Sequence, residues 1–161
     1  MRFEKWQALG NDYLIVTEPL SADEVQAICH RHTGVGADGV LVLERTEEPG
    51  FVAGLRIFNP DGSEAELSGN GAREAVLHLR RAGWTDQREF SIQTVAGEVR
   101  PTILDERTAR LDLGRARLRS DDFPGGGEDG RGELEAAGRS WAFQHVNVGN
   151  PQCAIFVEDE A

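Results

Sequence analysis

The sequence predicts an α+β protein, because many short apolar runs with the spacing of strands surround two segments with the spacing of helices. Three of the strand-like runs follow one another closely enough to form a meander. Hydrophobic residues make up 39% of the chain and charged residues 28%, so it can bury a core and does not resemble a disordered segment. Its 161 residues suit one ordinary domain or two small ones.

The chain is predicted to begin with a pair of strands. Residues 2–9 and 12–18 are apolar runs, and the break between them contains Gly10 and Asn11. A Gly-Asn dipeptide is typical of a tight turn, because both residues tolerate backbone conformations that other residues avoid. The first candidate ligand-binding residue, Asn11, is therefore expected at a hairpin turn.

A first helix is predicted over about residues 21–32. Ser21 and Glu24 form a capping box, in which each side chain satisfies a free backbone amide of the other residue. Apolar residues follow at helical spacing, and Cys29 lies on their stripe. We interpret Cys29 as a core cysteine rather than a reactive one.

A glycine-rich segment, residues 34–39, leads into a predicted strand at 40–43, and a further strand is expected at 51–59. A loop that cradles phosphate would follow a strand, open a helix and carry a lysine. The order here is the reverse and the lysine is missing. The segment is therefore not interpreted as a nucleotide site.

A second helix is predicted after residues 68–71, with Gly83 as its stop. Its apolar stripe is Ala72, Ala75, Val76, Leu79 and Ala82. Its polar face is expected to carry Arg73, Glu74, His78 and Arg80. His78 and His145 are interpreted as surface or strand histidines.

The meander is predicted from alternating apolar and polar residues at 88–95, 97–104 and 109–113. Two more strands are expected at 140–148 and 153–157, joined at a Gly-Asn-Pro turn.

The glycine-rich, polar stretch 114–132 is predicted to be a long loop or linker. We therefore divide the chain into a first α+β half, residues 1–113, the linker 114–132, and the opening strands of a second half, residues 133–161.

Composition excludes several classes of function. The net charge of −11 and a pI near 4.8 argue against nucleic acid as a partner, which requires a basic face. The sequence has neither a membrane-spanning apolar run nor a signal peptide, so we expect a cytoplasmic protein. Cys29 and Cys153 are too few for a disulfide framework or a cysteine metal site, and no residue cluster has metal-ligand spacing.

The segment Ser68-Gly69-Asn70-Gly71 is the strongest candidate for a binding site. Each glycine in a helix costs about 1 kcal/mol relative to alanine, so a function other than helix formation is indicated. Free amides at a helix start, together with the positive end of the helix dipole, bind carboxylates. The alternative is that Ser68 is a capping residue and the glycines form a turn.

Four asparagines, Asn11, Asn59, Asn70 and Asn150, lie at predicted turns or element ends beside glycine or proline. Each one alone suits a structural role, since asparagine favours turns. If the four converged on one ligand, they would suit a substrate rich in carboxylate and ammonium groups.

These segments together resemble the diaminopimelate epimerase family. The matching segments are Leu9-Gly10-Asn11-Asp12, residues 32–39, residues 56–64, Ser68-Gly69-Asn70-Gly71-Ala72-Arg73 and Gly149-Asn150-Pro151. The resemblance implies two similar α+β halves, each a mixed sheet wrapped around a central helix, with the substrate between the two helix starts. It also implies catalysis without cofactor or metal, in which two cysteines remove and return the proton of the substrate's α-carbon.

Carried across by position, the resemblance implies that Asn11, Asn59 and Asn150 hold polar groups of the substrate. It also implies that Gly69 and Asn70 hold the α-carboxylate. Two positions depart from the family's pattern. Ser68 stands at the position of the first catalytic cysteine, and Gln152 stands where the family usually has histidine.

The resemblance therefore implies a cofactor-independent epimerase that converts LL- to meso-diaminopimelate for lysine and peptidoglycan synthesis. The alternatives are a non-catalytic ligand-binding or partner module of the same fold, and a related racemase or dehydratase that uses Ser68. The second half is expected to be incomplete, so we expect the isolated chain to be inactive. Its expected partners are a small dicarboxylic diamino acid and either a second copy or a complementary second half.

Overall fold

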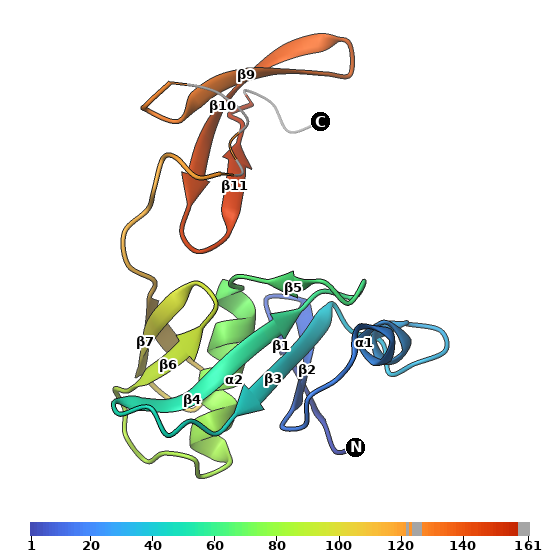
Figure 1. Cartoon of the computed structure of the whole chain (residues 1–161), viewed down its shortest axis with the longest axis vertical. Coiled ribbons are helices and arrows are strands. Elements are labelled where there is room, and N and C mark those ends of the chain that lie inside the picture. Colours follow the sequence, from blue (N-terminus) through green and yellow to red (C-terminus); the bar gives the residue numbers. More distant parts are fainter. Residues whose placement is uncertain (122, 124–126, 158–161) are drawn as a thin grey trace. The chain divides into compact units, whose positions relative to one another are not determined.

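The computed structural model describes residues 1–121, 123 and 127–157 (Figure 1). Two compact units make up the chain, Met1–Leu113 and Gly114–Ala161. Part of the predicted glycine-rich linker, including residues 125 and 126, lies outside the described residues. No helix within the described ranges has both the length and the apolar character needed to cross a membrane.

The first unit contains one mixed sheet of eight strands. Their bounds are β1 Glu4–Ala8, β2 Asn11–Val16, β3 Gly39–Glu44, β4 Phe51–Phe58, β5 Glu64–Ala65, β6 Ser91–Thr94, β7 Gly97–Ile103 and β8 Ala109–Asp112. The order is β1-β2-β3-β4-β6-β7-β8, and β5 pairs with β4. Strand β2 is parallel to β3 and β4 is parallel to β6, whereas the other pairs are antiparallel. The predicted hairpin and meander are therefore both present.

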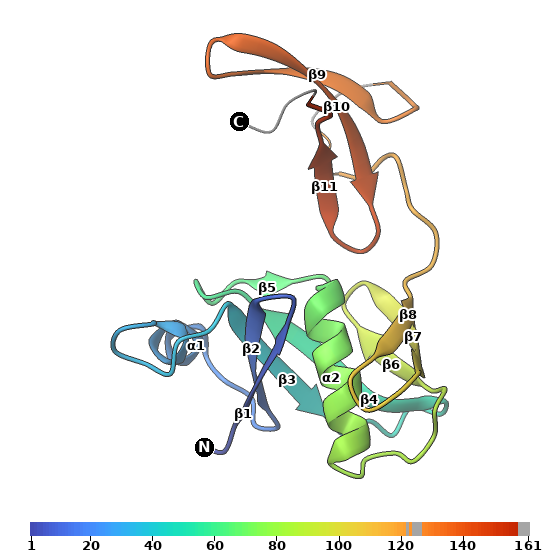
Figure 2. The same ribbon diagram turned by 180° about the vertical axis from the view of Figure 1, so that it is seen from behind.

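Helix α2, Gly69–Arg81, packs against the sheet over much of its length. It contacts strands from both edges and from the middle, namely β1, β2, β3, β4, β7 and β8. The sheet therefore curls around this helix, as the opposite views in Figures 1 and 2 show. The predicted α+β fold, a mixed sheet around a central helix, is confirmed.

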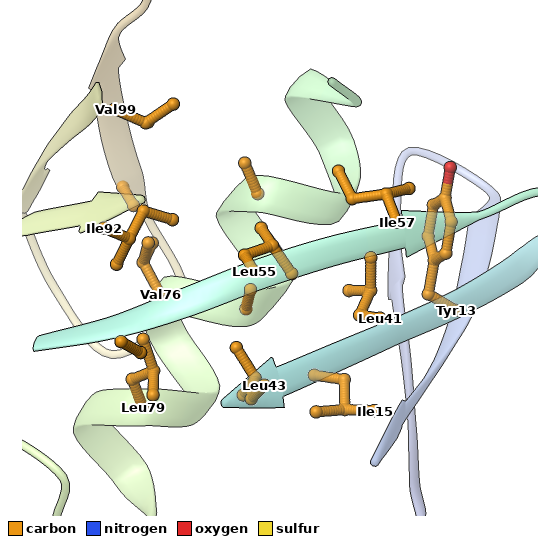
Figure 3. Packing of buried hydrophobic residues seen from close by; sticks show 14 of the residues in the cluster. Tyr13, Ile15, Leu41, Leu43, Leu55, Ile57, Val76, Leu79, Ile92 and Val99 are labelled. Atoms are coloured by element: carbon orange, nitrogen blue, oxygen red, sulfur yellow. The ribbon is translucent and has the colours of Figure 1, made fainter. Parts of the chain in front are cut away.

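The core between α2 and the sheet consists of side chains from alternate strand positions. Leu41 and Leu43 of β3 and Leu55 and Ile57 of β4 point toward the helix (Figure 3). Because successive residues of a strand point to opposite faces, the other positions of β2 and β3 face away from α2. The sheet is therefore apolar on both faces at these strands.

Helix α1, Ala22–Cys29, covers that second face with Val25, Ile28 and Cys29. The predicted capping box is present, and Cys29 is buried as predicted. The predicted end at residue 32 is wrong, because the helix ends at Cys29 and the backbone of His30 is already extended.

The glycine-rich loop ends α1 early. The backbone amides of Val35 and Gly36 both donate to the carbonyl oxygen of Ile28, at 2.9 and 3.0 Å. A Cβ at Gly34 would lie only 2.2 Å from the carbonyl oxygen of Ala27, so only glycine allows this close return. The loop thus terminates a helix, which is a structural function.

The second unit is a three-stranded antiparallel sheet in the order β11-β10-β9. Its strands are β9 Arg131–Ala136, β10 Arg139–Asn147 and β11 Pro151–Ala154. Strand β9 was not predicted, because its alternating pattern contains charged side chains and few apolar ones. The last strand begins at Pro151 rather than at residue 153, in agreement with the tolerance of a strand's first position for proline.

Candidate active site at the start of the central helix

Ser68 is the N-cap of α2, as one of the two interpretations of the sequence predicts. Its backbone is extended, and its Oγ accepts a hydrogen bond of 3.1 Å from the backbone amide of Gly71. The amides of Gly69 and Asn70 have no acceptor among the described residues. Two N–H groups at the positive end of a helix of 13 residues are therefore available to an anion.

The two glycines of this segment have different functions. A Cβ at Gly71 would lie 2.9 Å from Cδ2 of the buried Leu41, so Gly71 is required by packing. A Cβ at Gly69 would meet no atom within 4 Å, so packing does not require glycine there. Open space beside a glycine, as at Gly69, is expected where a ligand approaches the backbone.

A chain of side-chain hydrogen bonds links the helix start to the β1–β2 hairpin. Arg73 Nη1 donates to Asn70 Oδ1 at 2.9 Å, and Asn70 Nδ2 donates to Asn11 Oδ1 at 3.5 Å. Asn11 Nδ2 in turn donates to Asp38 Oδ2 at 3.1 Å. Arg73 can only donate, so it faces the carbonyl oxygen of the Asn70 side chain, and Asp38 accepts, so it faces the amino group of Asn11. These two partners therefore determine which way round each asparagine amide lies.

Ion pairs fix the hairpin and the loop before β3 in place. Arg31 Nη2 lies 2.7 Å from both Asp12 Oδ1 and Asp38 Oδ1, and Lys5 Nζ lies 2.9 Å from Asp12 Oδ2. The hydrogen bonds from Arg31, above all, hold the pKa of Asp12 well below its ordinary value. The same bonds raise the pKa of Arg31. Asp12 and Arg31 therefore stay charged over the whole physiological pH range, and Arg31 holds Asp38, the acceptor of Asn11, in place.

Asn59 follows β4 at the end of the sheet where the β1–β2 hairpin turn also lies. Tyr13 pairs with Gly39, and Val40 pairs with Phe58, so the end of β4 lies beside the beginnings of β2 and β3. The half-buried Asn59 donates from Nδ2 to Ser63 Oγ at 3.0 Å. This bond to Ser63, in the turn that follows Asn59, orients the side-chain amide of Asn59. Neither Asn11 nor Asn70 takes part in that bond.

Asn150 belongs to the second unit, in the turn between β10 and β11, where it is exposed. Gly149 next to it donates from its amide to Oδ1 of the buried Asn147 at 2.8 Å. The structure thus brings Asn11, Ser68, Gly69 and Asn70 together within the first unit. The contribution of Asn150 to the same site stays a prediction.

Two side chains near this site, Tyr13 and Asp38, were not predicted from the sequence. Tyr13 is buried, and its Oη lies 3.2 Å from Ser68 Oγ. Both residues belong to segments that carry the family resemblance or border them. The packing of α2 against β2 brings Tyr13 to Ser68, and the parallel pairing of β2 with β3 brings Asp38 to Asn11. That pairing joins segments 26 residues apart, so no local pattern indicates it.

The predicted polar face of α2 is partly wrong, because Glu74 and His78 are only 2% and 8% exposed. A helix that the sheet surrounds on several sides buries more than a single stripe. The carboxyl group of Glu74 lies inside the core beside the backbone of Ala8 and Tyr13. Burial, with repulsion from Asp12, raises the pKa of Glu74 to about 7.

The chemistry of this site is that of anion binding and charge stabilisation. Amides aimed at a carboxylate, in a fixed dipole, stabilise negative charge that builds up on a ligand during proton removal. Among the described residues, neither histidine, lysine nor carboxylate makes a hydrogen bond to Ser68 Oγ. Groups of three or more His, Cys, Asp or Glu side chains able to hold a metal are also absent from this part of the chain.

Solved structures share the fold of the chain. A probable proline racemase from Agrobacterium radiobacter matches 95% of this chain and 51% of its own, with a TM-score of 0.72 and 14% sequence identity. A hydroxyproline epimerase from Agrobacterium vitis matches 95% of this chain and 50% of its own, with a TM-score of 0.67 and 14% identity. The chain therefore shares its fold with these two proteins.

Sequence comparison is more specific. The family model described as diaminopimelate epimerase matches residues 3–119. A diaminopimelate epimerase of Picosynechococcus sp. is 40% identical over 100% of this chain, and one from Desulforudis audaxviator is 40% identical over 99%. The chain belongs to the diaminopimelate epimerase family.

The matches cover 62% and 61% of these two relatives. The chain thus spans about three fifths of the length of the curated relatives that it matches. The family, but not the activity of a whole epimerase, follows from these comparisons.

Proposed function

We propose that the chain is part of a cofactor-independent amino-acid epimerase that interconverts LL- and meso-diaminopimelate in the cytoplasm, for lysine and peptidoglycan synthesis. It would act as a homo-oligomer or together with a complementary second half. The observation that carries the proposal is the pair of free amides at Gly69 and Asn70, next to an oriented Asn11. The proposed substrate is the one after which the related diaminopimelate epimerases are named.

In this proposal the α-carboxylate of the substrate binds to the amides of Gly69 and Asn70. When the α-proton leaves, negative charge spreads onto that carboxylate, and the helix start stabilises it. Asn11 binds a polar group of the substrate with the amino hydrogen that does not bond to Asp38. Asn59 and Asn150 bind further polar groups, as the resemblance implies.

Ser68 would stand where the family has a catalytic thiol. A hydroxyl without an adjacent base accepts a proton far less readily than a thiol with a pKa of about 8.5. Among the described residues the contacts of Ser68 Oγ are the Gly71 amide and the Tyr13 hydroxyl, neither of which is such a base. This observation favours a second candidate function, a module that binds the ligand without turning it over. A racemase or dehydratase that uses the hydroxyl is the third.

The test is exchange of the α-proton of LL-diaminopimelate in heavy water. Because the curated relatives are longer, the chain is assayed together with the carboxy-terminal part of one of them, with the chain alone as a control. Three forms are compared, namely the parent, Ser68→Cys and Ser68→Ala. Ser68→Cys is expected to exceed the parent by about 10²–10⁴-fold, the range typical of a positioned acid or base.

Ser68→Ala is the matched control, because it removes the hydroxyl without adding a thiol. Equal exchange rates for all three forms, with diaminopimelate bound, would support the binding module instead of the epimerase. A parent that is faster than Ser68→Cys would support a reaction specific for the hydroxyl.

A further inference from the structure

Tyr13 contacts Ser68 from inside the core. The Tyr13 side chain is 6% exposed, and its Oη donates to Ser68 Oγ at 3.2 Å. In Figure 3 the ring stands beside Leu41, and its hydroxyl points to the end of the sheet where the β1–β2 hairpin turns. Tyr13 is thus a buried polar group beside the proposed site to which the mechanism above gives no role.

The backbone fixes the position of the Tyr13 ring. A Cβ at Gly39, its partner on β3, would lie 2.7 Å from Cε1 of the ring and 2.3 Å from the carbonyl oxygen of Phe58. The missing side chain at Gly39 therefore makes the space that the ring fills. Since the ring is held on this side by the sheet itself, the hydroxyl cannot move far from Ser68.

The hydrogen bonds of Ser68 determine what its hydroxyl can do. A serine hydroxyl has two lone pairs and one proton. The Gly71 amide donates to Ser68 Oγ at 3.1 Å, and Tyr13 Oη donates to the same atom at 3.2 Å. With both lone pairs in use, the proton of Ser68 is free to be donated to a third group.

We propose that Tyr13 is a positioning residue that makes Ser68 a hydrogen-bond donor to the ligand's carboxylate, beside the free amides of Gly69 and Asn70. The inference rests on the proposed carboxylate site. It deepens that proposal, because it gives position 68 of this chain a binding function that needs no proton abstraction.

The first test is a double-mutant cycle on the affinity for LL-diaminopimelate. Tyr13→Phe keeps the ring and removes the hydroxyl, so it is expected to weaken binding about three- to tenfold in the parent chain. In the Ser68→Ala background the same change is expected to have no effect, because the hydroxyl that Tyr13 orients is gone. An equal loss in both backgrounds would show a merely structural role and overturn the proposal.

The second test needs no ligand, so it stands even if the proposed epimerase function fails. Ser68→Cys places a thiol beside Tyr13, and a hydrogen bond donated to the thiolate lowers the thiol's pKa. Adding Tyr13→Phe is expected to raise that pKa by about 1, as measured by the pH dependence of alkylation. Cys153, which is exposed, is first replaced by serine, whereas Cys29 is buried. An unchanged pKa would overturn the proposal.

A spectroscopic measurement covers the case in which Tyr13→Phe does not fold. Tyr13 is the single tyrosine of the sequence, so fluorotyrosine supplied during expression labels this position alone. The ¹⁹F signal is expected to shift in Ser68→Ala relative to the parent, since the hydroxyl loses its acceptor. A signal that does not respond to Ser68→Ala would show that the two hydroxyls are not in contact.

Discussion

Gly69→Ala separates a ligand-binding function of the α2 start from a structural one. The backbone of Gly69 is not in the left-handed region, and a Cβ there would meet no atom within 4 Å. Alanine therefore fits without strain, and it restricts the unfolded chain more than glycine does. We expect the free energy of unfolding to rise by about 0.4–1 kcal/mol, which corresponds to an increase in Tm of roughly 1–4 °C for a chain of this length.

The same methyl group should weaken ligand binding. It would occupy the open space over the amides of Gly69 and Asn70, through which a carboxylate has to approach. We expect the affinity for LL-diaminopimelate to fall at least about tenfold, or about 1.4 kcal/mol. Calorimetric titration measures the affinity, and thermal unfolding of the same sample measures the stability.

Gly71→Ala is the matched control, because its Cβ would lie 2.9 Å from the buried Cδ2 of Leu41. Overpacking of this kind costs about 1–3 kcal/mol of stability. The two variants should therefore change the stability in opposite directions. A Gly69→Ala chain that binds the ligand as tightly as the parent, or that loses stability, would refute the assignment of Gly69.

Three further predictions concern the groups around the site. Burial raises the pKa of Glu74 to about 7, so the folded state binds the proton of Glu74 more tightly than the unfolded chain does. The free energy of unfolding should therefore fall by about 2–3 kcal/mol as the pH rises from about 4.5 to 7. Glu74→Gln should remove this fall, which urea denaturation at about pH 5 and pH 8 measures. Asp38→Ala removes the hydrogen-bond acceptor of the Asn11 amino group, so the affinity for diaminopimelate, measured by calorimetry, should fall several-fold. An unchanged affinity would exclude a role of Asp38 in orienting Asn11. Arg31→Gln should raise the pKa of Asp12 toward its ordinary value, which NMR titration of the carboxyl group detects; no change would contradict the ion pair.

Local patterns predicted the elements and the helix start well. The capping box at Ser21 and the apolar stripe of α2 depend on residues within a few positions of one another, so their pattern is complete in the sequence. The cost of glycine in a helix also indicated position 69, and the structure separates it from Gly71, which packs against Leu41. Only the fold could distinguish the two glycines, because the neighbour of Gly71 is 30 residues away in the chain.

Features that depend on distant segments were not predictable. The ion pair of Asp12 with Arg31 depends on the loop after α1, and the contact of Tyr13 with Ser68 depends on the packing of α2 against β2. The burial of Glu74 follows from the closure of the sheet around α2, which a single helical stripe does not reveal. The second unit was predicted less well, since β9 has a charged pattern and few apolar residues.

The central claim, that a ligand carboxylate binds to the start of α2, is tested most directly by NMR. The ¹⁵N-labelled chain is titrated with LL-diaminopimelate, and the backbone amides of Gly69 and Asn70 and the side-chain amide of Asn11 are followed. We expect these signals to shift together with one dissociation constant, and the shifts to be lost in Gly69→Ala. Saturable shifts located elsewhere in the first unit, with these three groups unchanged, would contradict the account.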